Sequence, residues 1–129
     1  MKERKGKFFN IKVDVKSALP VYEQIKRTIK LAILSGYLKE NDRLMSLRDM
    51  ALKLKINPNT IIKVYYQLEV EGFIYSRPGA GYFVKLDRRK IQKEKRELLE
   101  GITGEYISRV IKLGYSLEDM IREISRNAR

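Results

Sequence analysis

Polar residues with the chemistry to read nucleic-acid bases cluster around position 60. Asn57 and Pro58 are typical of a helix start, because asparagine caps free backbone N–H groups and proline fits the first helical turn. Beyond such a start, an asparagine can pair with adenine, a lysine can donate to guanine, and a threonine can bond a phosphate or touch a thymine methyl group. The candidate base-reading residues are Asn59, Thr60, Lys63 and Tyr66.

The neighbouring elements decide between a base-reading role and a plain helix start, which the same residues would form in any protein. Ser46 and Asp49 resemble a capping box that opens a short helix, which ends near Lys55. About three residues separate this helix from the one that begins at Asn57 and ends at Gly72, which is the connection of a helix-turn-helix. In a basic chain, this arrangement favours DNA reading.

A β-hairpin is expected after the second of these helices. The β-prone runs 73–76 and 82–85 flank a turn at 77–81 that is rich in proline and glycine. The order predicts a winged helix-turn-helix, whose wing could reach the minor groove or phosphates, although a glycine hairpin is also simply a turn. An arginine in the first turn of the short helix could contact a phosphate or be solvated. The candidate contacts are Arg48, Arg77, Gly79 and Gly81.

Three further segments are expected before the helix-turn-helix. Apolar residues at helical spacing predict a helix from about Pro20 to Ser35, ended by Gly36. Residues 9–14 alternate apolar and polar side chains, which suits a short strand or an extended segment. Residues 1–9 form a basic tail, for which a solvated terminus is favoured over a DNA contact.

Charge separates the chain into two regions. The net charge is +12, which favours an anionic partner, such as nucleic acid or an acidic membrane surface, over a generically basic protein. Residues 1–86 hold 17 Lys and Arg against 8 Asp and Glu, a balance of +9, whereas residues 87–129 hold 11 against 8, a balance of +3. We therefore expect a DNA-binding domain over 1–86 and a separate helical region over 87–129.

The helical region 87–129 has apolar stripes that it cannot bury alone. Gly101 and Gly104 either break its long helix or permit close helix approach, and Ser116 with Asp119 caps a last helix. Two helices of this length cannot enclose a core. The apolar stripes must be buried against the winged domain or, as the favoured alternative, against a second copy of the chain, which would make this a dimerisation region. The candidate interface residues are Leu98, Leu99, Ile102, Tyr106, Ile107, Val110, Ile111, Leu117, Met120, Ile121 and Ile124.

Missing residue types argue against other functions. The chain has no Cys and no His, so the usual zinc sites and the Ser-His-Asp and Cys-His catalytic arrangements are unavailable. No Gly-x-x-x-x-Gly-Lys loop or paired-carboxylate site is present either, so we expect no enzyme, no metal and no cofactor. No apolar run approaches the roughly 18 residues of a membrane span, and no signal peptide is evident, so we expect a cytoplasmic protein.

Six ordered motifs resemble the GntR family of bacterial transcription regulators. They are PVYEQI at 20–25, SGYL at 35–38, DRL at 42–44, SLRDMA at 46–51, LEVEGFI at 68–74 and RPGAGYFV at 77–84. The short tail after the wing resembles the YtrA-type subfamily, whose two C-terminal helices serve dimerisation. The resemblance implies a homodimeric repressor of a palindromic operator, often in a transporter operon. It also implies DNA contacts at Arg48, Asn59, Thr60 and Gly79.

The chain departs from the family pattern at four positions. Met45 replaces the usual proline, and Lys55 stands where a glycine is common and a left-handed backbone would cost about 1 kcal/mol. Ile62 stands where many relatives have a base-reading arginine, and Ala80 where the wing is often basic. The operator sequence is therefore not transferable from relatives.

The sequence thus predicts a mainly α protein with a small β-hairpin (α+β), a winged helix-turn-helix followed by a two-helix dimerisation region. The leading hypothesis is a sequence-specific regulator of double-stranded DNA, and the alternative is a winged helix that binds RNA or a protein partner. No residue constellation identifies a small-molecule effector. The choice between repressor and activator is also left open.

Overall fold

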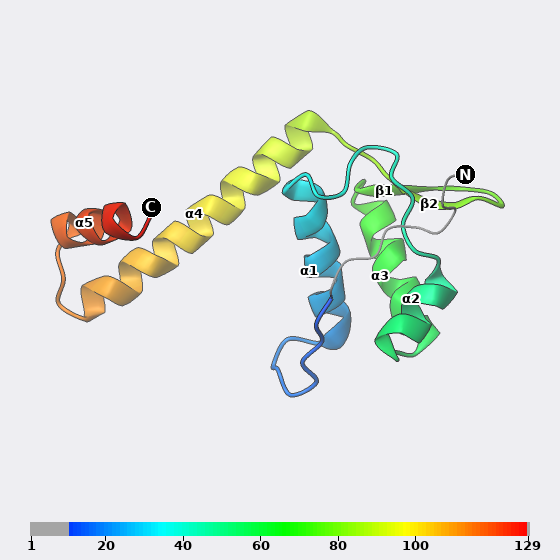
Figure 1. The fold of residues 1–129 in the computed structure, drawn as a ribbon, viewed down its shortest axis with the longest axis horizontal. Coiled ribbons are helices and arrows are strands. Elements are labelled where there is room, and N and C mark those ends of the chain that lie inside the picture. The colour runs from blue at the N-terminus through cyan, green and yellow to red at the C-terminus, as the bar shows by residue number, and fades with distance from the viewer. Residues whose placement is uncertain (1–10, 129) are drawn as a thin grey trace. The chain divides into compact units, whose positions relative to one another are not determined.

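The computed structural model describes residues 11–128, which contain five helices and one β-hairpin (Figure 1). The chain divides after Arg88 into two compact units. The expected fold class is confirmed, whereas the tail over 1–9 lies outside the described residues. The elements in chain order are α1 (Val21–Leu34), α2 (Leu47–Leu54), α3 (Pro58–Val70), β1 (Ile74–Arg77), β2 (Gly81–Val84), α4 (Arg88–Lys112) and α5 (Leu117–Asn127).

Helix α1 begins directly after Pro20 and buries one face in the first unit. Its apolar residues recur at helical spacing, and Ile25 and Ile29 are fully buried. The Gln24 side chain accepts a hydrogen bond from the Asp14 backbone N–H and donates to the Asp14 carbonyl, both at 2.8 Å. These bonds hold the preceding segment against α1. Residues 11–14 form no strand, and the backbone of Asp14 bonds to this helix side chain.

Caps define the helix-turn-helix as the sequence predicts. The Ser46 hydroxyl accepts the Asp49 backbone N–H at 3.0 Å and starts α2, and the Asn57 side chain accepts the Asn59 N–H at 2.8 Å and starts α3. Helix α2 ends at Lys55, whose φ of 57° and ψ of 47° place it in the left-handed region. A non-glycine residue therefore makes the turn between the two helices.

Tyr65 fixes α3 in the core. The residue is fully buried, and its hydroxyl donates a 2.7 Å hydrogen bond to the Met45 carbonyl just before α2. Its ring meets Tyr82 of β2 edge to face, with 5.1 Å between the ring centres. Burial, and secondarily Tyr82, raises the pKa of Tyr65, so the hydroxyl stays protonated as a donor. One side chain thus joins the helix-turn-helix to the hairpin.

The hairpin pairs β1 with β2 antiparallel, with Ile74 opposite Val84 and Arg77 opposite Gly81. These strands lie within one residue of the predicted runs at 73–76 and 82–85. The segment before α2 also pairs with β2 through backbone hydrogen bonds. Leu44 N–H donates to the Tyr82 carbonyl, and Val84 N–H donates to the Asp42 carbonyl, both at 2.9 Å. This pairing joins the wing to the segment that leads into α2.

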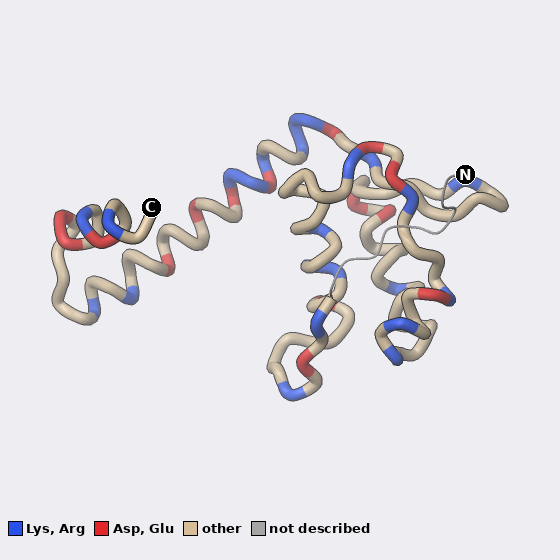
Figure 2. The backbone as a smooth tube through the Cα atoms, in the orientation of Figure 1, with Lys and Arg blue, Asp and Glu red and all other residues tan. Residues whose placement is uncertain are grey.

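The second unit consists of most of α4 together with α5. Helix α4 runs unbroken through Gly101 and Gly104, and none of its residues is buried. Its charged residues are basic at the start, mixed over 93–97, acidic at Glu100 and Glu105, and basic again in the last turn (Figure 2). Ser116 and Asp119 form the expected capping box of α5, and hydrogen bonds from Ser116 and Arg122 hold the pKa of Asp119 below its ordinary value. Within residues 11–128, no helix combines the length and apolar character of a membrane span.

Candidate nucleic-acid interface

The buried face of α3 leaves its opposite face free for a partner. Its inner residues Ile61, Val64 and Leu68 are fully buried against α1 and α2. The candidate residues Asn59, Lys63 and Tyr66 are exposed, and Thr60 is half-buried. The structure therefore places the four predicted base-reading residues outside the core on one helix, with Asn59, Thr60 and Lys63 in its first half and Tyr66 about one turn later.

Lys63 contacts α1. Its ammonium lies 3.7 Å from the centre of the Tyr22 ring, close enough for a cation–π attraction. A shallow pocket of about 300 Å³ lies at this point, between the beginnings of α1 and α3. Its lining residues are Val21, Tyr22, Asn59, Thr60 and Lys63. Two helices thus contribute to the surface around the candidate residues.

The two arginines predicted to contact DNA phosphates or the minor groove lie on two other elements. Arg48 is exposed in the first turn of α2, and Arg77 is exposed at the end of β1. The guanidinium of Arg77 lies 4.1 Å from the centre of the Phe83 ring, so the wing itself orients this cation. The first unit thus carries candidate DNA-contacting side chains on three elements, which are α2, α3 and β1.

The wing tip needs its glycines for different reasons. Gly79 has a φ of +74° with open space around it, whereas Gly81 has a φ of +111° and touches Arg43. A Cβ at position 81 would lie 3.3 Å from the Arg43 Nε. That same Nε donates a 2.9 Å hydrogen bond to the Ala80 carbonyl. Gly79 therefore leaves bare backbone for a close approach, and Gly81 makes room for an arginine that holds the tip.

Sequence reasoning missed two supporting residues. From the sequence, Tyr22 is expected only to belong to the apolar face of the first helix, and no role is expected of Arg43. Both act across the fold, Tyr22 on Lys63 and Arg43 on Ala80. The members of each pair are far apart in the sequence, so no local pattern links them. The sequence shows only an aromatic residue and a cation near the ends of predicted elements.

Comparison with known proteins adds a family likeness to this geometry. The family described as bacterial regulatory proteins, gntR family, matches residues 21–84. The HTH-type transcriptional repressor YtrA of Bacillus subtilis is 37% identical over 91 residues, which are 70% of this chain and 65% of that protein. This relative is thus covered for just under two thirds of its length.

Two solved structures extend the likeness. A GntR family transcriptional regulator from Listeria monocytogenes superimposes with a TM-score of 0.75 at 32% identity, covering 86% of this chain and 97% of the other. The AraR DNA-binding domain in complex with operator ORE1 gives a TM-score of 0.51 at 26% identity, covering 60% and 94%. The first match includes the helical C-terminal region, and the second was solved on DNA.

Proposed function

Because this chain belongs to the GntR family of bacterial regulatory proteins and is of the YtrA type, we propose that it is a homodimeric repressor that binds a palindromic operator. At the coarser level it is a DNA-binding transcriptional regulator and not an enzyme. One observation supports the operator proposal most strongly: the first half of α3 presents Asn59 and Lys63 exposed and Thr60 half-buried, in the same unit as a glycine wing. These side chains match the donors and acceptors of the major groove.

The dimer proposal rests on apolar surface in the second unit. On α4, Leu98, Leu99, Ile102 and Ile111 are exposed, and on α5 so are Leu117, Ile121 and Ile124. Tyr106, Ile107 and Val110 are half-buried. Met120 differs, because it is only 2% exposed within its own chain. We therefore assign it to packing inside the unit and the other ten residues to the interface.

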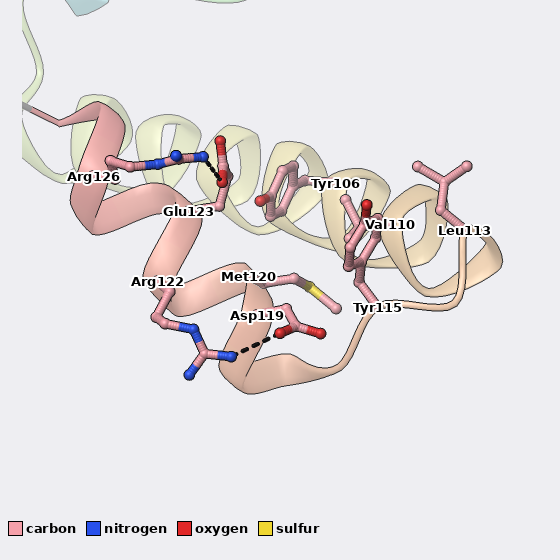
Figure 3. A pocket seen from close by; sticks show the side chains of 9 residues that line it. All are labelled: Tyr106, Val110, Leu113, Tyr115, Asp119, Met120, Arg122, Glu123 and Arg126. Carbon is pink, nitrogen blue, oxygen red and sulfur yellow. Dashed lines mark hydrogen bonds and ion pairs between the residues drawn. The ribbon is translucent and has the colours of Figure 1, made fainter.

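A groove between α4 and α5 offers a second copy a place to bind. It has a volume of about 720 Å³, and it is lined by Tyr106 and Val110 of α4, Met120 of α5 and Tyr115 of the turn between them (Figure 3). Arg122 pairs with Asp119 at 2.7 Å on α5, and Arg126 pairs with Glu123. An apolar floor with charged groups beside it is the composition expected of a protein interface.

A symmetric dimer would place two α3 helices on one face of DNA. A twofold protein contacts the same sequence twice, so its operator is an inverted repeat with half-sites one or more helical turns apart. The regulated genes follow from that operator, and the family resemblance makes a transporter operon the first candidate to examine.

Selection of genomic DNA fragments by the purified chain, followed by gel shift, tests the proposal. We expect an inverted repeat, binding that weakens steeply with salt as counterions are displaced, and one dimer per site. Binding without sequence preference at physiological salt would contradict the operator. Sedimentation of a monomer at micromolar concentration would contradict the dimer.

A double variant separates DNA reading from the alternative of an RNA or protein partner. Asn59→Ala with Lys63→Ala should weaken operator binding by about 1 to 3 kcal/mol for each side chain that reads a base. Lys39→Ala changes an exposed lysine in the loop after α1 and is the matched control for removal of a charge. Unchanged regulation by the double variant would favour the alternative partner.

A further inference from the structure

An apolar row follows the polar start of α3 on the same outward face. Ile62, Tyr66 and Val70 are spaced by four residues, so their side chains stack along one side of the helix. They are 48%, 64% and 67% exposed. The opposite face of α3 fills the core, so this row is not part of the packing of the first unit.

The charges around the row point to nucleic acid as its cover. The only acidic residue of α3 is Glu69, and its carboxylate accepts a 3.0 Å hydrogen bond from the Ser76 hydroxyl on β1. The first three turns of the outward face therefore carry no negative charge. They lie in the region of the chain that holds a balance of +9. A polyanion suits this surface better than a second apolar protein face does.

Within a major groove, an isoleucine has one apolar feature to contact. Every base pair presents hydrogen-bonding groups there, but only thymine presents a methyl group, at C5. Ile62 can neither donate nor accept, so opposite guanine or cytosine it would leave polar groups without partners. Ile62 is also one turn beyond Asn59, which keeps it within the leading half of the helix.

We propose that Ile62 reads the C5 methyl group of a thymine in each half-site, with the Tyr66 ring covering the next step along the groove. The inference rests on the proposed operator binding and adds a base preference to it. It assigns a specificity role to a side chain without hydrogen-bonding groups. We therefore expect an A·T base pair at this position of each half-site.

The experiment uses the operator selected by the full chain and replaces its thymines one at a time by deoxyuridine. Deoxyuridine pairs like thymine but lacks the methyl group. Wild-type protein should lose about fourfold in affinity at one thymine per half-site, the factor for about 0.8 kcal/mol per buried methyl-sized group. Ile62→Ala should bind the thymine and deoxyuridine forms of that operator equally.

Leu52→Ala is the matched control, because Leu52 is a 69% exposed apolar residue on α2. It should retain the full deoxyuridine effect. Thermal unfolding and sedimentation of Ile62→Ala should match the wild type, since alanine favours helix and the side chain is exposed. A dissociated Ile62→Ala dimer would instead assign the row to a protein interface and overturn the proposal.

Three other results would overturn the proposal while leaving the proposed function intact. They are a selected operator without thymine in its half-sites, a deoxyuridine operator bound as tightly as the original, and a full deoxyuridine effect in Ile62→Ala. If the wild type selects no operator at all, the proposed function fails first and this inference fails with it.

Discussion

The Lys63 ammonium lies 3.7 Å from the centre of the Tyr22 ring, so a side chain of α1 sets the position of a candidate base-reading side chain on α3. A free lysine samples many rotamers, and ordering it on DNA costs conformational entropy. The contact with Tyr22 restricts the rotamers of Lys63 already in the unbound protein. We therefore expect this contact to contribute to DNA affinity without Tyr22 having to touch a base.

Tyr22→Leu should weaken operator binding about two- to fivefold, because it removes a cation–π attraction of about 0.5 to 1 kcal/mol. Tyr22→Phe retains the aromatic face and should bind like the wild type. Fluorescence anisotropy with a labelled operator measures both variants. In a Lys63→Met background, Tyr22→Leu should have no further effect. An equal reduction in that background would show that Tyr22 acts on DNA by itself.

Lys55→Gly should stabilise the protein by about 1 kcal/mol, because glycine adopts the left-handed conformation without a Cβ clash. Lys55 ends α2 with a φ of 57°. Lys55→Ala is the control, since it removes the same side chain but keeps the backbone cost. Thermal or urea unfolding of both variants gives the comparison. Equal stability of the glycine and alanine variants would argue against strain at this turn.

Local signals in the sequence predicted the elements that position the site. Ser46, Asn57 with Pro58, and Ser116 each start a helix within one residue of the expected position. Their side chains bond to backbone groups only two or three residues away, so the relevant physics is contained in a short segment. The left-handed backbone at Lys55 was indicated differently, by the family resemblance, in which a glycine is common at this position.

Contacts between distant segments could not be predicted in this way. The bonds of Arg43 to Ala80 and of Tyr65 to Met45 depend on how the hairpin and helices pack. Gly101 and Gly104 left the continuity of α4 open, because each glycine weakens a helix by about 1 kcal/mol without forbidding it. Ion pairs between Arg96 and Glu100, and between Arg109 and Glu105, lie on either side of the glycines.

Glu71, just after α3, joins that helix to α1 through two lysines. Its carboxylate pairs with Lys26 and, at 3.2 Å, with Lys30. Partial burial would raise the pKa of Glu71, but the hydrogen bonds and charges of the two lysines outweigh it, so the pKa lies below its ordinary value of 4.5. A carboxyl group whose folded pKa is lowered stabilises the fold above its unfolded pKa and loses that contribution as pH falls.

Glu71→Gln should therefore destabilise the protein by about 1 kcal/mol at pH 7, a value suited to a partly exposed ion pair. The difference from the wild type should persist down to about pH 4.5 and shrink below it as Glu71 is protonated. Urea unfolding at pH 7, 5 and 3.5 follows this trend, and Glu40→Gln at an exposed position is the control. A difference that stays constant across this range would exclude the ion pairs as its source.

Ile121→Gln tests whether the apolar stripe of α5 joins two copies of the chain. Ile121 is 55% exposed in one copy, so the substitution should leave the fold of each copy intact. In a symmetric interface the exposed half of the side chain is buried twice, at about 0.8 to 1.6 kcal/mol each, so dimer dissociation should increase at least about tenfold. Analytical ultracentrifugation measures the change. Glu118→Gln changes an exposed position of the same helix that does not line the groove between α4 and α5, so that variant should remain dimeric. Equal dissociation constants for the two variants would place the interface elsewhere.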